Sequence, residues 1–380
     1  MKKLCIQDIS EMVNLGLDLE TEILAWLPLK SLMLFRCVQR SWNVLVQSPA
    51  FLKRRHMNMH DSPSLMILNK KQNYVTLLSC DNLIHIKSPF SNNSHYPITM
   101  EGICNGVFCL KGFCWYNSCV NELAILNPTT REVHRIPHTC YLSNGSYLYG
   151  FGADDSNIID FKVVKLCINN HWRKHKLSVS SAEVYSLITK SWTPTRHPPP
   201  PFTIITRQCP FKYNTLVNGV YHWITKNSFY HRYDGVANIL CFNFRNDQFH
   251  QLRGPTLSAE DRYFLCDEEV AEIKGFLAYV VQCHYNNLKI WVMDHRNGWE
   301  KKYNIVPPLF NFRMCGLWKN GDQLLGGRAG ELLRSYDHQG NSLCQFQIDV
   351  DYAKYFWIHE YVPSIAPLSA YLAKALVTPN

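Results

Sequence analysis

The sequence lacks the short motifs that mark common catalytic and metal-binding sites. None of the 15 cysteines stands in a C-x-x-C pair, which argues against zinc ribbons, RING-type sites and thioredoxin-like motifs. Neither G-x-S-x-G nor H-E-x-x-H occurs. No run of 18 apolar residues predicts a membrane span, and the residues after Leu4 are too polar to predict a signal peptide. Many cysteines without a secretory signal favour free thiols in a reducing compartment.

The chain is rich instead in apolar and aromatic side chains. Hydrophobic residues make up 46% of the 380 positions, with 20 Tyr, 19 Phe and 10 Trp, a composition that favours half-buried strands. The length allows one large domain plus a small one, or two mid-sized ones. The net charge is +9, but dense basic clusters occur only at residues 53–56 and 171–176. Because nucleic-acid binders concentrate such charge on one element, we predict neither a nucleic-acid nor a membrane partner.

The first 50 residues carry a helical pattern that the rest of the chain lacks. Leu19, Ile23 and Leu27 recur at helical spacing, and Pro28 ends that helix and can open the next. Two further apolar faces follow, and Ser48-Pro49 stops the last one, so three short helices are predicted. A unit this small is rarely stable alone. Its apolar faces must pack either on the following domain or on another protein, and the physics alone leaves both open.

After Phe51 a loose repeat predicts a mostly β domain. Each unit has a strand, a gap, a strand ending in a polar turn, and a short further strand. Five units begin at Asn105, Tyr149, Asn218, Ile273 and Asn320, and residues 64–86 could supply a sixth. Their polar turns lie roughly 43–62 residues apart, a spacing typical of β-propeller blades. We predict a kelch-like propeller of about six repeats, closed by a C-terminal strand from "WIHEYVPSIAPL"; a pair of β-sandwiches is the alternative.

The helical segment resembles a known family. "EILAWLPLKSLMLFRCVQRSW", followed by "SPAF", resembles the F-box of plant F-box proteins, and the match covers Leu15–Phe51. In that family the motif docks on the Skp-type linker of a cullin-based ubiquitin ligase. The resemblance implies that this contact is carried by Leu15, Ile23, Leu24, Leu27, Pro28 and Leu32. Gly16 stands where the family usually has proline, which removes a fixed φ angle and a small apolar contact.

The β repeats resemble the F-box-associated domain of the same plant proteins. The strings "CNGVFCL", "LNPTTRE", "NGVYHWI" and "EYVPSIAPL" belong to this resemblance, which spans about Ile103–Leu368. Their order is most similar to S-locus F-box proteins, the pollen-side components of ribonuclease-based self-incompatibility, although other plant F-box proteins share most of these strings. The predicted domains are an F-box over residues 10–55 and an F-box-associated substrate-binding domain over residues 60–370.

Three other patterns favour structural roles. Cys104, Cys109, Cys114 and Cys119 recur every five residues, a step that changes the face of a strand each time, so packed free thiols are favoured over zinc. The prolines at 198–201 are read as a stiff connector rather than a ligand for an aromatic groove. "YGFGADD" lacks the phosphate-loop pattern, and its acids would repel phosphate.

The segments between strands hold the candidate target-binding residues. Loops at one end of a propeller form a binding face. The long candidates are residues 92–96, 171–180, 196–207, 228–235 and 253–264. Aromatic and arginine side chains are enriched at interface hot spots. The candidates of this kind are His171, Trp172, Arg173, Tyr230, Arg232 and Tyr233.

The function predicted from the sequence is that of a non-catalytic adaptor. The helices would tether the chain to a Skp-type linker and cullin, and the β domain would hold a target for ubiquitination and proteasomal degradation. The resemblance implies a non-self pistil ribonuclease as target, in the cytoplasm or nucleus of pollen or the pollen tube. Catalytic residues, a metal and a cofactor are not expected. A general plant F-box adaptor for a regulatory or defence protein, or a ligand-binding propeller without a ligase, are the alternatives.

Overall fold

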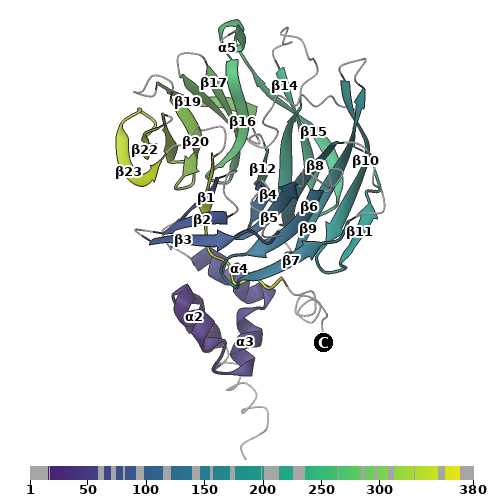
Figure 1. Cartoon of the computed structure of the whole chain (residues 1–380), viewed down its shortest axis with the longest axis vertical. Helices are drawn as coiled ribbons and strands as arrows, with labels where there is room; N and C mark the ends of the chain where they lie inside the picture. Colours follow the sequence, from purple (N-terminus) through teal and green to yellow (C-terminus); the bar gives the residue numbers. More distant parts are fainter. Residues whose placement is uncertain are drawn as a thin grey trace, which may run out of the picture.

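The fold is given by a computed structural model of the chain. It describes residues 16, 18–58, 64–69, 74–79, 82–90, 98–113, 121–138, 146–154, 157–171, 176–197, 199–200, 214–225, 236–263, 265–283, 287–294, 296, 298–306, 312–328, 330–349 and 356–368. Within these ranges six four-stranded antiparallel sheets stand above a group of helices (Figure 1). No helix among the described residues is long and apolar enough to cross a membrane.

Each sheet is one blade of a propeller. Blade 1 holds β24 (Phe356–Tyr361), β1 (Ser64–Asn69), β2 (Tyr74–Ser79) and β3 (Asn82–Lys87). Blade 2 holds β4 (Ile98–Cys104), β5 (Val107–Phe113), β6 (Asn121–Asn127) and β7 (Glu132–Ile136). Blade 3 holds β8 (Ser146–Asp154), β9 (Asn157–His171), β10 (Lys176–Ser186) and β11 (Ser191–Pro194).

The second half of the ring repeats this order. Blade 4 holds β12 (Asn214–Val217), β13 (Val220–Thr225), β14 (Val236–Asn243) and β15 (Gln248–Thr256). Blade 5 holds β16 (Leu265–Ile273), β17 (Phe276–Cys283), β18 (Leu288–Asp294) and β19 (Gly298–Ile305). Blade 6 holds β20 (Arg313–Trp318), β21 (Gln323–Gly327), β22 (Leu332–Tyr336) and β23 (Ser342–Asp349). The predicted propeller of about six repeats is confirmed.

Blade 1 closes the ring because it takes strands from both ends of the domain. β24 pairs antiparallel with β1 along its whole length, from Ser64 opposite Tyr361 to Asn69 opposite Phe356. The expected closing strand therefore exists, and it is the innermost strand of its blade.

Two recurrent turns explain why these sequences form blades. The hairpin between the first and second strands of blade 2 turns at Asn105-Gly106, with φ angles of 48° and 70°. Blade 4 turns in the same way at Asn218-Gly219, with φ angles of 49° and 72°. A two-residue turn with both φ angles positive matches the twist of the flanking strands, and Asn-Gly is the pair that best tolerates it.

The polar turn between the third and fourth strands is a second local device. The side-chain oxygen of Asn127 accepts hydrogen bonds from the backbone N–H of Thr129, and Asn243 and Asp294 do the same for Arg245 and Arg296. This Asx turn lets a side chain replace a backbone partner at the corner.

Four helices precede the propeller in the described part of the chain. Residues 18–26 are helical, followed by α2 (Leu29–Phe35), α3 (Arg40–Val46) and α4 (Pro49–Asn58). Pro28 occupies the N-cap of α2, as the pattern predicts. α4 is additional to the three predicted helices: the Ser48 hydroxyl accepts from the Phe51 backbone N–H at 3.2 Å, so Ser48-Pro49 ends one helix and caps the next. One further short helix, α5 (Ala259–Tyr263), lies at the opposite end of the molecule (Figure 1).

The turn at Gly106 allows a test of the ring's packing. A Cβ at Gly106 would lie 2.2 Å from the carbonyl oxygen of Val362, whereas a Cβ at Gly275 meets nothing within 4 Å. Both glycines have positive φ angles, of 70° and 80°, so alanine costs roughly 1–2 kcal/mol of backbone strain at either position. We expect Gly106→Ala to lower the free energy of unfolding by about 1–3 kcal/mol more than Gly275→Ala, because only the former also forces an overlap. Urea unfolding measures both, and equal losses would contradict the packing at Val362.

Candidate functional site

The helices form a small module with its own buried interior. Leu24, Leu32, Val46 and Phe51 are each at most 3% exposed. The guanidinium of the buried Arg55 donates to the backbone carbonyls of residues 25 and 27 at 3.2 and 2.7 Å, which ties α4 to the end of the first helix. Carbonyls at a helix end lack intrahelical partners, so this arginine both satisfies them and fixes the angle between the two helices.

The interior of the module continues into the propeller. The buried residues of the helices share one hydrophobic cluster with Phe161 and Leu187 of blade 3 and with Ile365 and Leu368 of the C-terminal segment. α4 lies against β9. The helices are therefore packed on blades 2 and 3, and one of the two alternatives for their apolar faces is realised: one face packs on the β domain.

The C-terminal segment, residues 362–368, fastens this joint by hydrogen bonds. The buried Asn127 side-chain amide donates to the carbonyl oxygen of Ala366 at 2.8 Å. The backbone N–H of Leu368 donates to the carboxylate of Glu132 at 2.8 Å, and that of Ser364 donates to the Thr129 hydroxyl at 3.2 Å. The outer turn of blade 2 thus serves as the anchor for the segment that lies between propeller and helices.

A second apolar face of the helical module stays uncovered. Six large apolar side chains in the helices and their turns are between 56% and 71% exposed: Leu19, Ile23, Trp26, Leu34, Val38 and Val44. Leu19, Ile23 and Trp26 follow one another at steps of four and three residues, so they form one stripe on the helix of residues 18–26. Exposed apolar patches of this kind mark surfaces that bind other proteins.

Five of the six predicted linker-binding residues lie in the described part of the chain, and they divide between these two faces. Ile23 and Pro28 are exposed and Leu27 is half-buried. Leu24 and Leu32 are buried inside the module, at 3% and 0% exposure. Leu15 lies outside the described residues. The helical spacing of Leu19, Ile23 and Trp26 was a signal that could have placed Leu19 and Trp26 among the candidates, since it follows from the sequence alone.

In chain order, the predicted target-binding segments fall between the second and third strands of blades 3 and 4, or between one blade and the next. The described strand ends that flank them lie at the end of the propeller opposite the Asx turns, near which the helices pack. α5, within the predicted segment 253–264, lies at that far end in Figure 1. His171 ends β9. Trp172, Arg173, Tyr230, Arg232 and Tyr233 lie outside the described residues, so their role stays a prediction.

A cavity of about 490 Å³ lies at the centre of the ring. Its walls come from β4, β12, β16, β20 and β24 and extend to the inner hairpin turns. None of its described lining residues comes from β8. The Tyr221 hydroxyl of blade 4 donates to the carbonyl oxygen of Glu101 in blade 2 at 2.6 Å, which joins these two blades in front of blade 3.

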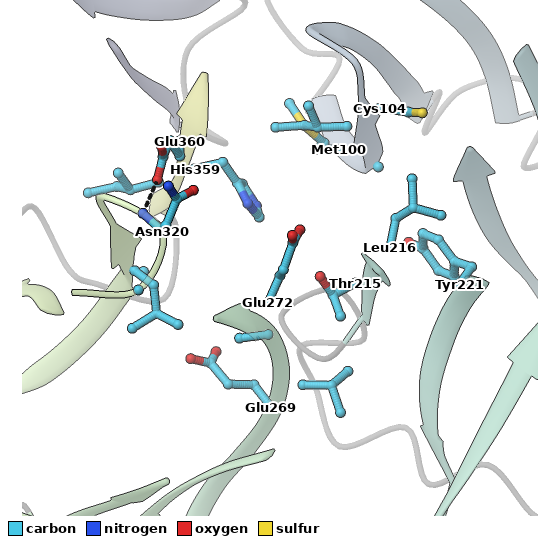
Figure 2. A pocket seen from close by; sticks show the side chains of 18 of the residues that line it. Met100, Cys104, Thr215, Leu216, Tyr221, Glu269, Glu272, Asn320, His359 and Glu360 are labelled. Atoms are coloured by element: carbon cyan, nitrogen blue, oxygen red, sulfur yellow. Dashed lines mark hydrogen bonds between the residues drawn. The ribbon is translucent and has the colours of Figure 1, made fainter. Parts of the chain in front are cut away.

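Acidic side chains and one imidazole face this cavity. Glu272 and His359 extend into the same space from β16 and β24, with Thr215 and Met100 around them (Figure 2). The side chains of Glu272 and His359 are exposed to the cavity, whose walls enclose them. Desolvation by these walls, and then the charge of Glu360, raise the pKa of Glu272. Desolvation lowers the pKa of His359 to about 4, so its ring is neutral at pH 7. One carboxylate oxygen of Glu360 accepts from the backbone N–H of Asn320 at 2.9 Å.

The cysteines do not gather around an ion in the part of the chain that the structure describes. Cys104 and Cys109 are buried on neighbouring strands, and burial raises the pKa of Cys109. Cys114 and Cys119 lie outside the described residues. Across the described ranges, no group of three or more His, Cys, Asp or Glu side chains is placed to hold a metal ion.

The fold and the helical module define a class of protein: a six-bladed propeller with an N-terminal helical docking module. The model of the F-box associated beta propeller domain matches residues 57–368. An F-box/kelch-repeat protein of Arabidopsis thaliana is 23% identical over 320 residues, which cover 79% of this chain and 81% of that protein. The F-box protein CPR1 of the same plant is 23% identical over 319 residues, 78% of this chain and 74% of that protein.

The chain belongs to the family of plant F-box proteins with an F-box-associated propeller, as the resemblance predicts. Among solved structures, AofleA from Arthrobotrys oligospora aligns over 80% of this chain and 94% of that chain, at 10% identity and a TM-score of 0.40. A likeness of that size carries no functional information.

The joint between helices and propeller can be tested at Asn127. Replacing Asn127 by alanine removes its Asx turn and leaves the buried carbonyl of Ala366 without this donor. Replacing Asn243, its counterpart in blade 4, removes the Asx turn alone. We expect Asn127→Ala to cost about 1–3 kcal/mol more in the free energy of unfolding than Asn243→Ala. Limited proteolysis of the C-terminal segment should be faster in the first variant only; equal proteolysis in both would contradict the anchor.

Proposed function

We propose that this chain is the substrate-recognition subunit of a Skp–cullin–F-box ubiquitin ligase and carries no catalytic group itself. The observation that carries the proposal is the uncovered apolar stripe of Leu19, Ile23 and Trp26 on a helical module whose other face is packed on the propeller. An uncovered stripe of large apolar side chains on a stable module needs a protein partner. Membership of the F-box family supports a Skp-type linker as that partner.

The buried and exposed residues of the module have different parts in this proposal. Ile23 and Pro28 touch the linker, and Leu27 lies at the edge of the contact. Leu24 and Leu32 hold the helices in the geometry that presents the stripe. Leu15 would extend the contact beyond the described helix. Gly16, which stands where the family usually has proline, would weaken this part of the contact.

A subunit of this kind acts by proximity. The helices bind the ligase at one end, and the loops at the other end of the propeller hold the target. The receptor raises the effective concentration of target lysines near the ubiquitin-charged enzyme, so it needs no acid, base or nucleophile. The shared hydrophobic cluster favours a fixed distance between the two ends, because the module and the propeller are packed as one body.

For the target we propose a non-self pistil ribonuclease, which makes this chain a pollen-side S-locus F-box protein of the cytoplasm or nucleus. This target is supported by the residues of the repeat motifs and by the order of these motifs along the chain. A net charge of +9 gives no overall attraction to a basic ribonuclease, so complementarity has to be local. The alternative targets are regulatory or defence proteins of other tissues.

The linker contact can be tested with single charge insertions. Ile23→Asp and Trp26→Asp each place a carboxylate in the stripe, at positions that are 63% exposed, so the module can still fold. Because a charge buried in an apolar interface loses its hydration, we expect copurification with a Skp-type linker to fall by at least about tenfold. Val306→Asp is the matched control, an apolar residue 60% exposed on the propeller. Unchanged linker binding by both stripe variants would refute the proposal.

The target face can be tested separately. In pull-downs from pistil extract, Trp172→Ala with Tyr230→Ala should reduce capture of the ribonuclease and leave linker binding unchanged, because large aromatic anchors contribute most of the binding energy of an interface. Capture that is unaffected by both changes would remove these loops from the target face. Transcript abundance in leaves equal to that in pollen would count against the S-locus target without affecting the adaptor role.

A further inference from the structure

The central cavity has the size and the charge of a ligand site. Its volume of about 490 Å³ falls within the roughly 300–1,000 Å³ of small-molecule sites. Four glutamates and a single lysine line it: Glu101, Glu269, Glu272, Glu360 and Lys274. In a chain of net charge +9, an acidic interior is a local feature that the overall composition does not impose.

Two lysines among the described residues at the cavity are paired with carboxylates other than Glu272 and Glu360. The ammonium group of Lys274 pairs with Asp322 at 2.7 Å, and Lys111, behind the wall, pairs with Glu101 at 2.9 Å. His359 faces Glu272 across the cavity, and desolvation by the cavity walls lowers the pKa of its ring to about 4, so it is neutral at pH 7. The Asn320 backbone supports Glu360 with a dipole and not with a full charge. Desolvation, and then the charge of Glu360, raise the pKa of Glu272.

We propose that this cavity binds a small organic cation, with Glu272 and Glu360 as counter-charges to its ammonium or guanidinium group. Thr215 and the neutral ring of His359 lie beside Glu272 and can hydrogen-bond the remaining N–H groups, and Met100 and Leu216 offer apolar surface to methylene groups (Figure 2). A confined carboxylate attracts a cation more strongly than one in bulk water, because solvent screens it less.

The geometry favours an organic cation over a metal ion. The described residues place no three His, Cys, Asp or Glu side chains together as metal ligands, and the volume far exceeds that of a single ion. The ammonium or guanidinium group could belong to a free amine or to a lysine or arginine side chain of another protein. The inference does not rest on the ligase role, and the proposed target loops lie at the far end of the propeller.

Calorimetry on the full chain tests the proposal with cadaverine and agmatine as probes and 1,5-pentanediol as the uncharged counterpart. We expect both cations to bind with a dissociation constant below about 1 mM and to raise the melting temperature, whereas the diol does neither. Binding should weaken as salt concentration rises. No binding of either cation, or equal binding of the diol, would overturn the proposal.

Two isosteric variants locate the site. Glu272→Gln and Glu360→Gln should each weaken cation binding at least about tenfold, since each removes one counter-charge and keeps the shape. Glu300→Gln is the matched control, because Glu300 lies on the outer strand β19 and pairs with Lys302 at 2.6 Å. An equal loss in Glu300→Gln would show non-specific attraction and overturn the site. Should a glutamine variant fail to fold, Thr215→Leu narrows the cavity at constant charge and must also weaken binding.

The source of the cation is settled by a second set of probes. A tripeptide ending in lysine or arginine that competes with cadaverine would point to a partner's side chain, and no competition would point to a free amine. Cation binding should also release protons at a pH near the raised pKa of Glu272. The other titratable or charged groups among the described residues lining the cavity are Glu101, Glu269, Glu360, His359, Lys274, Tyr221, Cys104 and Cys315. Calorimetry in buffers of different ionisation enthalpy measures this proton release. No release near the pKa of Glu272 would refute the role of Glu272.

Discussion

The pairing of β24 with β1 is the interaction on which the rest of the structure depends. It closes the ring with six residue pairs, from Ser64–Tyr361 to Asn69–Phe356. Without it, the inner edge of β1 would be unpaired, which is the hazard that closure removes. The same pairing also directs the chain after Tyr361 across the turns of blade 2, where Asn127 and Glu132 fix it. Ring closure and attachment of the helices are thus consequences of one strand.

The attachment explains why the helical module is stable although it is small. Three to four short helices bury too little surface to fold reliably alone. Here Leu24, Leu32 and Phe51 belong to one cluster with Phe161 and Leu368, so the propeller supplies the missing interior. One apolar face is used for this joint, and the stripe on residues 18–26 stays exposed. Of the two alternatives that the sequence leaves open, packing on the propeller is realised by one face, and docking on another protein is the proposal for the other.

Local patterns predicted the fold well, and distant contacts limited the prediction of the sites. Asn-Gly pairs and Asx turns act within a few residues, so blade count and closing strand could be inferred from the sequence. The fourth helix was missed because Ser48-Pro49 both stops α3 and caps α4. The cluster that buries Leu24 and Leu32 joins Val46 and Phe51 of the helices to propeller residues far along the chain, and the cavity depends on five strands spread over the chain. Neither has a local signature.

The departure of the ring from six-fold symmetry links the cavity to the helical joint. The hydrogen bond from Tyr221 to Glu101 brings blades 2 and 4 together, and the Trp223 indole N–H donates to the carbonyl of Tyr149 at 3.2 Å just behind it. Blade 3 is thereby separated from the central cavity. Its inner residues pack into the cluster that carries the helices instead. Blades 1, 2, 4, 5 and 6 surround a polar, acidic space, whereas blade 3 provides the apolar surface on which the helices pack. A symmetric ring could not provide both, because a wide central channel would leave the apolar surface of blade 3 hydrated.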